Sequence, residues 1–391
     1  MDCEHIQPVP TNDQLLPGRT VNRIVVGTQS DVKKQVVLEC LKDTIFWANV
    51  EPEWVCCDGS GNPEQPVNSG QRCAERRMKK ILDGDAANTT PSTLYIAIEN
   101  GIDTENVAIK GLNDLKEDAS KPKRIVDVCY VVLCHGAEKF VSPSIQIDCP
   151  HEYFYKAMET STEGFEFAAD GFPQTMGTMV HNDHPDIPAT NWMSSPKFST
   201  VSRETQMHGA IRTGLIKVLI AENIAYFKDF PIPGVIFKDL SYVLAQPDLL
   251  RFLSEGMAYD IQRLGWDKKC DQIAGLDARG FIYGPILAYE ICKGFVMIRK
   301  KGKLPGEKVT CNYDTEYSNC DIEIMKETIK PGENIIAVDD LQATGGTMMA
   351  AIELLRAGGA NVVGTYCVLE VPALREVFKK KIGDVPWACF I

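Results

Sequence analysis

Short apolar runs alternate with stretches of helical periodicity along much of the chain. Residues 22–28, 94–98 and 128–133 are compact, β-branched and apolar, which is typical of buried strands. Apolar positions spaced three and four apart over 33–43 predict a helix, and a basic helix is expected over 73–82. Strands that alternate with helices in this way favour an α/β fold.

The same pattern suggests how the chain is organised. Residues 1–20 are polar and contain three prolines, as expected for a tail. Residues 160–200 are rich in Pro, Gly and Asn, so loops are expected there, and a helix is expected over 202–221. A length of 391 residues suits two domains with little linker between them. We place an N-terminal domain over 21–215 and a C-terminal domain over 216–391.

One segment joins the pattern of a buried strand to candidate chemistry. Four apolar residues over 335–338 run into Asp339 and Asp340, small residues follow at 343–347, and helical periodicity begins at Met348. Backbone N–H groups in such a loop and at a helix N-terminus bind phosphate dianions. The acid pair then lies where ribose hydroxyls or a magnesium ion would come. The segment matches neither the Walker A pattern nor GxGxxG, so it predicts a sugar-phosphate site.

This segment and four others carry a family resemblance. The sequences VDDLQATGGT (338–347), FPIPGVIFKDLS (230–241), IAGLDARGFIYGP (273–285), IRKKGKLPG (298–306) and YDTEY (313–317) occur in family order. Together they resemble the type I phosphoribosyltransferases, and within them the adenine phosphoribosyltransferases. The resemblance implies a parallel sheet flanked by helices, with a small hood. It also implies that adenine and phosphoribosyl pyrophosphate (PRPP) are converted to AMP and pyrophosphate, with Mg²⁺ as cofactor.

The resemblance assigns residues to each part of the substrates. The small-residue loop would bind the 5′-phosphate, and the acid pair would bind the ribose hydroxyls directly or through magnesium. Arg279 would contact the pyrophosphate, which suits a guanidinium fork. Glu316 would act as the general acid on the purine ring nitrogen. Beside these catalytic residues, the expected PRPP and AMP site comprises Asp339, Asp340, Ala343, Thr344, Gly345, Gly346, Thr347, Arg299, Lys300, Lys303 and Tyr317.

The expected adenine site comprises Val235, Phe237 and Lys238, with the Phe237 ring available for stacking. Two positions depart from the common family pattern: Lys238 stands where many members have Arg, and Ser318 replaces a Gly. Another purine base therefore stays open as the substrate. A regulatory protein that binds PRPP or nucleotides without turnover is a further alternative.

The N-terminal domain carries a second resemblance. The segments VVGTQSDVK (25–33), GNPEQPVNSGQRCAERR (61–77), YIAIENGID (95–103) and SRETQ (202–206) resemble the inosine/xanthosine triphosphatase family. That family hydrolyses non-canonical purine nucleoside triphosphates and implies a mixed α/β domain. Inosine and xanthosine triphosphate (ITP and XTP) therefore become candidate substrates.

The second resemblance predicts a triphosphate site that contains Thr28, Lys33 and Glu99. It also predicts Asp58 and Glu99 as metal ligands. Ser30 replaces an expected Asn, and Asp58 is shifted by one residue from the expected acid. Two interpretations stay open: an active hydrolase of ITP and XTP, or a degenerate domain retained for folding, dimerisation or regulation.

The composition limits the kinds of partner and the location that we expect for the chain. A net charge of −12 argues against general nucleic-acid binding. No apolar run approaches the roughly 20 residues of a membrane span, and the N-terminus lacks a secretory pattern. Fourteen cysteines are scattered without paired CxxC motifs, so reduced thiols and a cytoplasmic location are expected. Both resemblances imply a homodimer that acts on small molecules.

Overall fold

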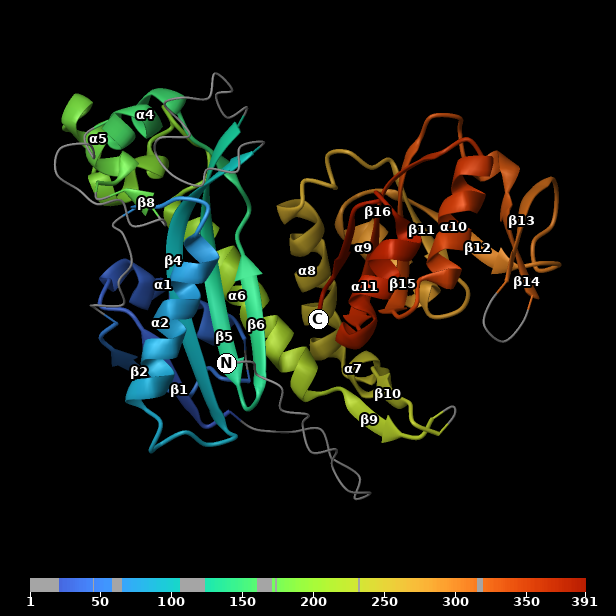
Figure 1. Ribbon diagram of the computed structural model, residues 1–391, viewed down its shortest axis with the longest axis horizontal. Coiled ribbons are helices and arrows are strands. Elements are labelled where there is room, and N and C mark those ends of the chain that lie inside the picture. The colour runs from blue at the N-terminus through green and yellow to red at the C-terminus, as the bar shows by residue number, and fades with distance from the viewer. Residues whose placement is uncertain are drawn as a thin grey trace. The chain divides into compact units, whose positions relative to one another are not determined.

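The computed structural model describes residues 21–44, 46–57, 65–105, 124–159, 171–172, 174–230, 233–314 and 319–391. The chain divides into two compact units, and the division lies between Tyr242 and Val243 (Figure 1). The sequence-based border at 215/216 falls instead within the helix α6 (Arg203–Glu222). This helix is continuous and packs on the sheet of the first unit, so no break separates residues 215 and 216.

The first unit is built on a mixed sheet with the order β2-β1-β4-β5-β6, in which β7 also pairs with β5. Strands β2, β1 and β4 are parallel, whereas β4, β5 and β6 are antiparallel. The strands are β1 (Arg23–Gly27), β2 (Pro52–Val55), β4 (Thr93–Glu105), β5 (Arg124–His135), β6 (Glu138–Pro143) and β7 (Ile147–Asp148). The predicted strands therefore exist, but β4 and β5 are longer than their apolar runs.

Helices cover both faces of this sheet. At Gly70, α2 (Gly70–Gly84) lies against Tyr130 of β5, whereas at Gly214, α6 lies against Leu133. Since residues three apart on a strand point to opposite faces, the two helices cover opposite faces. Ser30 caps α1 (Asp31–Asp43), which packs on α6. The predicted helices over 33–43, 73–82 and 202–221 are thus confirmed.

The stretch expected to be loops contains regular structure. Helix α5 (Met176–Asp183) begins where the Thr175 side chain accepts a hydrogen bond from the Thr178 N–H at 3.1 Å. Its buried residues join the apolar cluster that includes α4 (His151–Glu159) and the 3₁₀ helix η1 (Ala189–Ser194). The loop prediction was wrong over 176–183, and residues 160–170 lie outside the described ranges. Two small antiparallel sheets complete this unit: β3 (Gln65–Pro66) pairs with the distant β8 (Gly171–Phe172), and β9 (Ala225–Lys228) pairs with β10 (Ile236–Asp239).

The second unit, which begins within α7 (Ser241–Ala245), has a sheet with the order β13-β14-β12-β11-β15-β16-β17. Neighbouring strands from β12 to β17 are parallel, and β14 pairs antiparallel with β12 and β13. The strands are β11 (Gln272–Leu276), β12 (Gly294–Lys300), β13 (Lys308–Asp314), β14 (Asn319–Met325), β15 (Asn334–Gln342), β16 (Asn361–Glu370) and β17 (Trp387–Cys389).

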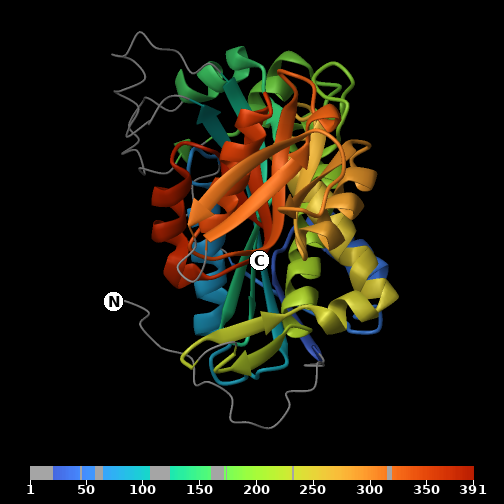
Figure 2. The ribbon, with the colours of Figure 1, turned by 90° about the vertical axis from the view of Figure 1, so that its right-hand side faces the viewer.

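Helices flank this sheet on both sides, as Figure 2 shows with α10 and α11 in red and α8 and α9 in gold. The helices are α8 (Pro247–Arg263), α9 (Gly280–Glu290), α10 (Gly346–Ala357) and α11 (Arg375–Ile382), with short 3₁₀ helices η2 (Lys326–Thr328) and η3 (Pro372–Leu374). Ala274, Ile335 and Ala337 share a buried core with α10 and α11. Both units are α/β, as predicted. Within the described ranges, no helix combines the length and apolarity needed to cross a bilayer.

Candidate active site

The acid pair and two arginines gather at one edge of the second sheet. Because β11, β12 and β15 are parallel neighbours, their carboxyl ends lie at the same edge. Arg279, which directly precedes α9, places Nη1 2.8 Å from Oδ2 of Asp340 on β15. Arg299 near the end of β12 places Nε 3.2 Å from Oδ2 of Asp277. The structure therefore brings Arg279 and the predicted acid pair together and places Arg299 on a neighbouring strand.

Glycines allow this close approach. A Cβ on Gly280 would lie 2.6 Å from the Val338 carbonyl oxygen and 3.4 Å from Oδ1 of Asp339. A Cβ on Gly275 would likewise lie 2.6 Å from the Gly280 carbonyl oxygen. The turn between β11 and α9 is thus pressed against the backbone of β15, which fixes Arg279 beside the acids.

The two carboxyl groups share an unusual electrostatic environment. Burial, and then the neighbouring charge of Asp340, raise the pKa of Asp339 to about 8, although Arg279 opposes the rise. Burial also raises the pKa of Asp340. The Asp340 N–H donates to Oδ1 of Asp339 at 3.0 Å. The carboxyl pair therefore holds a proton near neutral pH in the absence of ligand. A bound hydrogen-bond donor or cation can take the place of that proton, so the pair favours such ligands.

The small-residue loop leads into α10 as a phosphate-binding turn would. Gly345 adopts φ 84°, in the left-handed region, and α10 begins at Gly346 without a capping side chain. The helix starts two residues earlier than the predicted Met348, because Gly345 makes the turn and its carbonyl accepts the Met349 N–H at 2.8 Å. Thr344 and Thr347 are partly exposed. The loop thus presents a helix N-terminus at the edge that carries Asp339.

The region that contains this site is similar to known proteins. A family model described as a phosphoribosyl transferase domain matches residues 244–389. Adenine phosphoribosyltransferase of Rattus norvegicus is 46% identical over 169 residues, which are 43% of this chain and 92% of the rat protein. This chain belongs to the adenine phosphoribosyltransferase family. The Mus musculus enzyme is 44% identical over the same shares of the two chains.

A solved adenine phosphoribosyltransferase from Saccharomyces cerevisiae, complexed with an imino-altritol bisphosphate and adenine, is also similar to this chain. It is 33% identical, with a TM-score of 0.43, and the match covers 45% of this chain and 99% of the yeast chain. The rat and mouse relatives confirm, at the level of the family, the resemblance expected for the C-terminal half of the sequence.

The structure describes the positions of some of the other residues that the adenine phosphoribosyltransferase resemblance assigns, and their roles stay predictions. Lys300 and Lys303 are exposed in or beside the turn that follows β12. Glu316 and Tyr317 lie outside the described residues, so their roles stay predictions. Val235, Phe237 and Lys238, which are predicted to bind adenine, belong to the first unit. There the Phe237 ring packs edge-on against Phe230, with centroids 5.1 Å apart.

In the first unit, the structure brings two of the predicted triphosphate-site residues together. The Lys33 ammonium lies 3.9 Å from Oε1 of Glu99 and donates to the Ile98 carbonyl at 3.1 Å. Burial lowers the pKa of Lys33. Thr28 accepts a hydrogen bond from the Ser30 N–H at 3.1 Å, just before α1. Lys33 and Glu99 thus form a partly buried cluster near the end of β1.

Arg77 on α2 completes this cluster, with Nε 2.5 Å from Oε2 of Glu99. Sequence reasoning missed Arg77, although it lies within the quoted segment GNPEQPVNSGQRCAERR. Because two cations already engage Glu99, the donor set there does not favour a metal ion, and Asp58 lies outside the described residues. Over the residues that the structure describes, no cluster of three or more His, Cys, Asp or Glu side chains could hold a metal.

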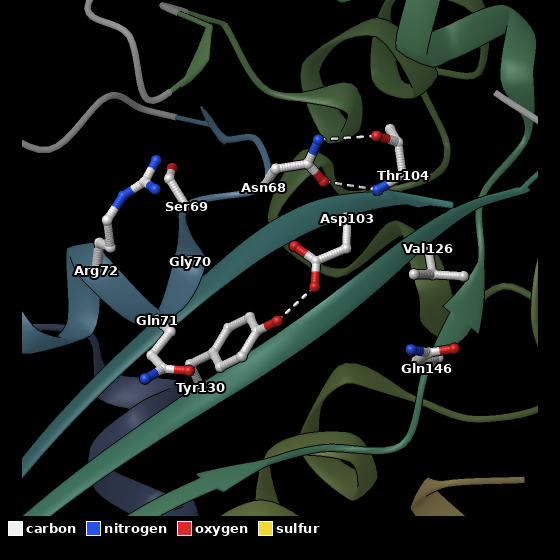
Figure 3. Close-up of a pocket in the computed structure, with 10 residues that line it drawn as sticks. All are labelled: Asn68, Ser69, Gly70, Gln71, Arg72, Asp103, Thr104, Val126, Tyr130 and Gln146. Carbon is white, nitrogen blue, oxygen red and sulfur yellow. Dashed lines mark hydrogen bonds between the residues drawn. The ribbon is translucent and has the colours of Figure 1, made fainter. Parts of the chain in front are cut away.

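A polar pocket of about 560 Å³ lies elsewhere in the first unit, between the start of α2 and strands β4 and β5 (Figure 3). Tyr130 donates to the Asp103 carboxyl group on its floor. Asn68 and Thr104 exchange two hydrogen bonds of 2.8 Å at its wall. Sequence reasoning did not single out this pocket, although residues 68–72 and Asp103 lie within two of the segments quoted for the triphosphatase resemblance. The other side of the pocket, with Tyr130 and Gln146, comes from a distant part of the sequence.

Proposed function

We propose that this chain transfers the phosphoribosyl group of PRPP to adenine and releases pyrophosphate. The observation that carries the proposal is the ion pair between Arg279 and Asp340, set at the carboxyl edge of a sheet beside the Gly345 turn. Membership of the adenine phosphoribosyltransferase family supports the choice of reaction. The choice of adenine as the substrate rests on the relatives, which are adenine phosphoribosyltransferases, and on the resemblance of residues 230–241.

The proposed reaction breaks the bond from ribose C1 to pyrophosphate oxygen and forms one from C1 to a purine nitrogen, which loses its proton. The 343–347 loop would hold the 5′-phosphate through backbone N–H groups, so that C1 is fixed in place. Asp339 and Asp340 would accept hydrogen bonds from the ribose hydroxyls. Arg279 would exchange Asp340 for the leaving pyrophosphate, where its charge stabilises the developing anion.

Magnesium fits the donor set of this site. Mg²⁺ is commonly bound by one or two carboxylates together with substrate phosphates. Asp339 and Asp340 provide an adjacent carboxylate pair with raised pKa values, which a cation would relieve. When bound, the ion would neutralise charge on the pyrophosphate.

Glu316 is proposed to exchange a proton with the purine: it would take up the proton that the purine loses as the bond to C1 forms, and it would act as the general acid on the purine in the reverse direction, with Tyr317 as part of the same site. Glu316→Gln should lower kcat on the order of a hundredfold, because it removes the group that transfers this proton. Glu327→Gln is the matched control, since Glu327 is exposed on η2. Wild-type kcat in the Glu316 variant would reject the role.

The transferase proposal is tested with the purified full chain, PRPP and Mg²⁺, supplied in turn with adenine, hypoxanthine and guanine. We expect AMP and equimolar pyrophosphate with adenine. Product with hypoxanthine or guanine alone would assign another base. Tight PRPP binding without pyrophosphate release from any base would favour the regulatory alternative.

We propose a second activity for the first unit, the hydrolysis of ITP or XTP. The cluster of Lys33, Arg77 and Glu99 supports it, because two cations near the start of α1 suit a polyphosphate. The competing proposal is a degenerate domain with a structural or regulatory role, in which Glu99 serves only to neutralise buried cations. Magnesium-dependent release of phosphate or pyrophosphate from ITP by the full chain would decide between them.

A further inference from the structure

The turn that follows β12 is clamped by one buried carboxylate. Glu323 on β14 is only 1% exposed, and its Oε1 accepts hydrogen bonds from the backbone N–H groups of Lys303 at 2.9 Å and Leu304 at 2.8 Å. We call residues 301–307 the lysine turn. A buried carboxylate is costly unless such donors satisfy it, so this contact fixes the backbone of the turn.

A second side chain closes the clamp. Lys308 donates from Nζ to the Leu304 carbonyl at 3.1 Å and lies 3.8 Å from Oε2 of Glu323. Burial alone would raise the pKa of Glu323. The backbone N–H groups over 302–304, together with the Lys308 charge, outweigh burial and hold the pKa below its usual value. Glu323 is therefore ionised at neutral pH, and its charge is engaged within the turn.

The clamp lies directly beside the phosphate-binding candidates. Glu323 pairs in register with Arg299 across β12 and β14, and Ile322 pairs with Lys300. Asp321, two residues before Glu323, accepts from the Lys301 ammonium at 2.6 Å. Three lysines lie at the end of β12 and in the turn: Lys300, Lys301 and Lys303. Asp321 thus holds Lys301, whereas Lys300 and Lys303 are exposed on either side of Lys301.

Glycines at both ends make the turn depend on this anchor. Gly302 and Gly306 adopt φ 82° and 71°, so the backbone between them reverses direction through conformations that glycine tolerates. Glycine also allows many other conformations. Backbone hydrogen bonds hold the two ends of the turn, from the Lys301 N–H to the Asp321 carbonyl at 2.9 Å and from the Lys326 N–H to the Glu307 carbonyl at 3.0 Å. Between these ends, Glu323 and Lys308 bind the backbone at residues 303 and 304. Loss of the carboxylate would release the segment that carries Lys303.

We propose that Glu323 is a positioning residue for the pyrophosphate group of PRPP: by fixing the lysine turn, it presents Lys300 and Lys303 to the substrate. The inference rests on the proposed transferase function. Glu323 itself touches no substrate, because its carboxylate is directed into the turn. Its effect should therefore fall on PRPP binding rather than on adenine binding or on the chemical step.

The test compares Glu323→Gln with wild type in steady-state kinetics and in PRPP binding by calorimetry. We expect KM and Kd for PRPP to rise on the order of tenfold, because charge-assisted hydrogen bonds to the turn become neutral ones. The KM for adenine and kcat should change less than twofold, roughly within the error expected for an uninvolved surface change. Glu307→Gln is the matched control: Glu307 lies in the same turn, its side chain is 75% exposed, and it should leave all constants unchanged.

Limited trypsin digestion gives a readout that is independent of turnover. Cleavage after Lys301 and Lys303 should be several-fold faster in Glu323→Gln than in wild type or in Glu307→Gln. If Glu323→Gln does not fold, Glu323→Asp keeps the charge on a shorter side chain and should give smaller shifts in the same constants. Unchanged PRPP affinity together with unchanged cleavage would overturn the proposal, as would a fall in kcat alone.

These experiments distinguish a failure of the transferase proposal from a failure of the positioning role of Glu323. A wild-type chain that releases pyrophosphate with none of the three bases refutes the transferase, while the binding and digestion measurements still decide the role of Glu323. An active wild-type chain with an indifferent Glu323→Gln refutes only the positioning role.

Discussion

Gly280→Ala tests whether the turn between β11 and α9 must lie against the acid pair. The added methyl group would sit 2.6 Å from the Val338 carbonyl oxygen, which is backbone and cannot rotate away. To reach an ordinary contact distance, the turn and β15 would have to separate by about 0.8 Å. That displacement falls on Arg279 and Asp339, the groups that the proposed chemistry needs in register.

The magnitude follows from two known costs. Overpacking a tight contact destabilises a protein by about 1–3 kcal/mol, which lowers the melting temperature by a few degrees in a domain of this size. A misplacement near 1 Å in a reacting site costs up to about a hundredfold in rate. We therefore expect Gly280→Ala to melt a few degrees lower and to lose roughly ten- to a hundredfold in kcat/KM.

The assay is thermal unfolding followed by circular dichroism, together with steady-state kinetics for adenine and PRPP. Gly294→Ala is the matched control, because a Cβ there meets only the flexible Gln272 side chain at 3.4 Å or more. It should match wild type in both measurements. If Gly280→Ala also matched wild type in both, the close contact between the turn and β15 would not hold the site together.

Three further predictions concern charge. Ribose hydroxyls should bind the ionised form of Asp339, whose pKa is about 8 without ligand, so PRPP affinity should rise by up to about tenfold per pH unit from pH 6 to 8. Calorimetry at several pH values should show that Asp339→Asn loses this component; an equal slope in both proteins would contradict it. Arg279→Gln should lower kcat/KM for PRPP on the order of a hundredfold, and should raise the pKa of Asp339 further; an unchanged rate would remove Arg279 from the mechanism. Glu99→Gln should abolish any ITP hydrolysis, and should lower the melting temperature even without hydrolysis, because Arg77 and Lys33 lose their counter-charge. An unchanged melting temperature would show that the cluster contributes nothing to stability.

The strands show how far hydrophobic pattern predicts the fold. The apolar runs at 94–98 and 128–133 correctly located β4 and β5. The pairing between the two strands, however, continues beyond these runs to Glu105 of β4 and Arg124 of β5. Antiparallel pairing continues there because each strand supplies the other's hydrogen bonds, which an apolar run in one segment does not reveal. Helix α5 was missed for a related reason: its stability comes from a Thr175 cap and from burial of Met176 and Met179.

For the candidate site too, the sequence predicts some residues and not others. The acid pair and the glycine turn were predictable, because the strand, loop and helix that hold them are consecutive in the sequence. The pairing of Arg279 with Asp340 depends on β11 lying beside β15, and the roles of Glu323 and Arg77 depend on contacts between distant segments. Such residues have no local signature, since an isolated glutamate or arginine usually marks a solvated surface.

The most direct test of the central claim is the rate at which the purified full chain converts adenine and PRPP to AMP, measured by mass spectrometry of the product beside Asp340→Asn. The account predicts AMP in equal amount to pyrophosphate from the wild-type chain, and a loss on the order of a hundredfold in the variant, in which Arg279 loses its partner at the substrate edge. No AMP from the wild-type chain, or an undiminished rate in Asp340→Asn, would contradict it.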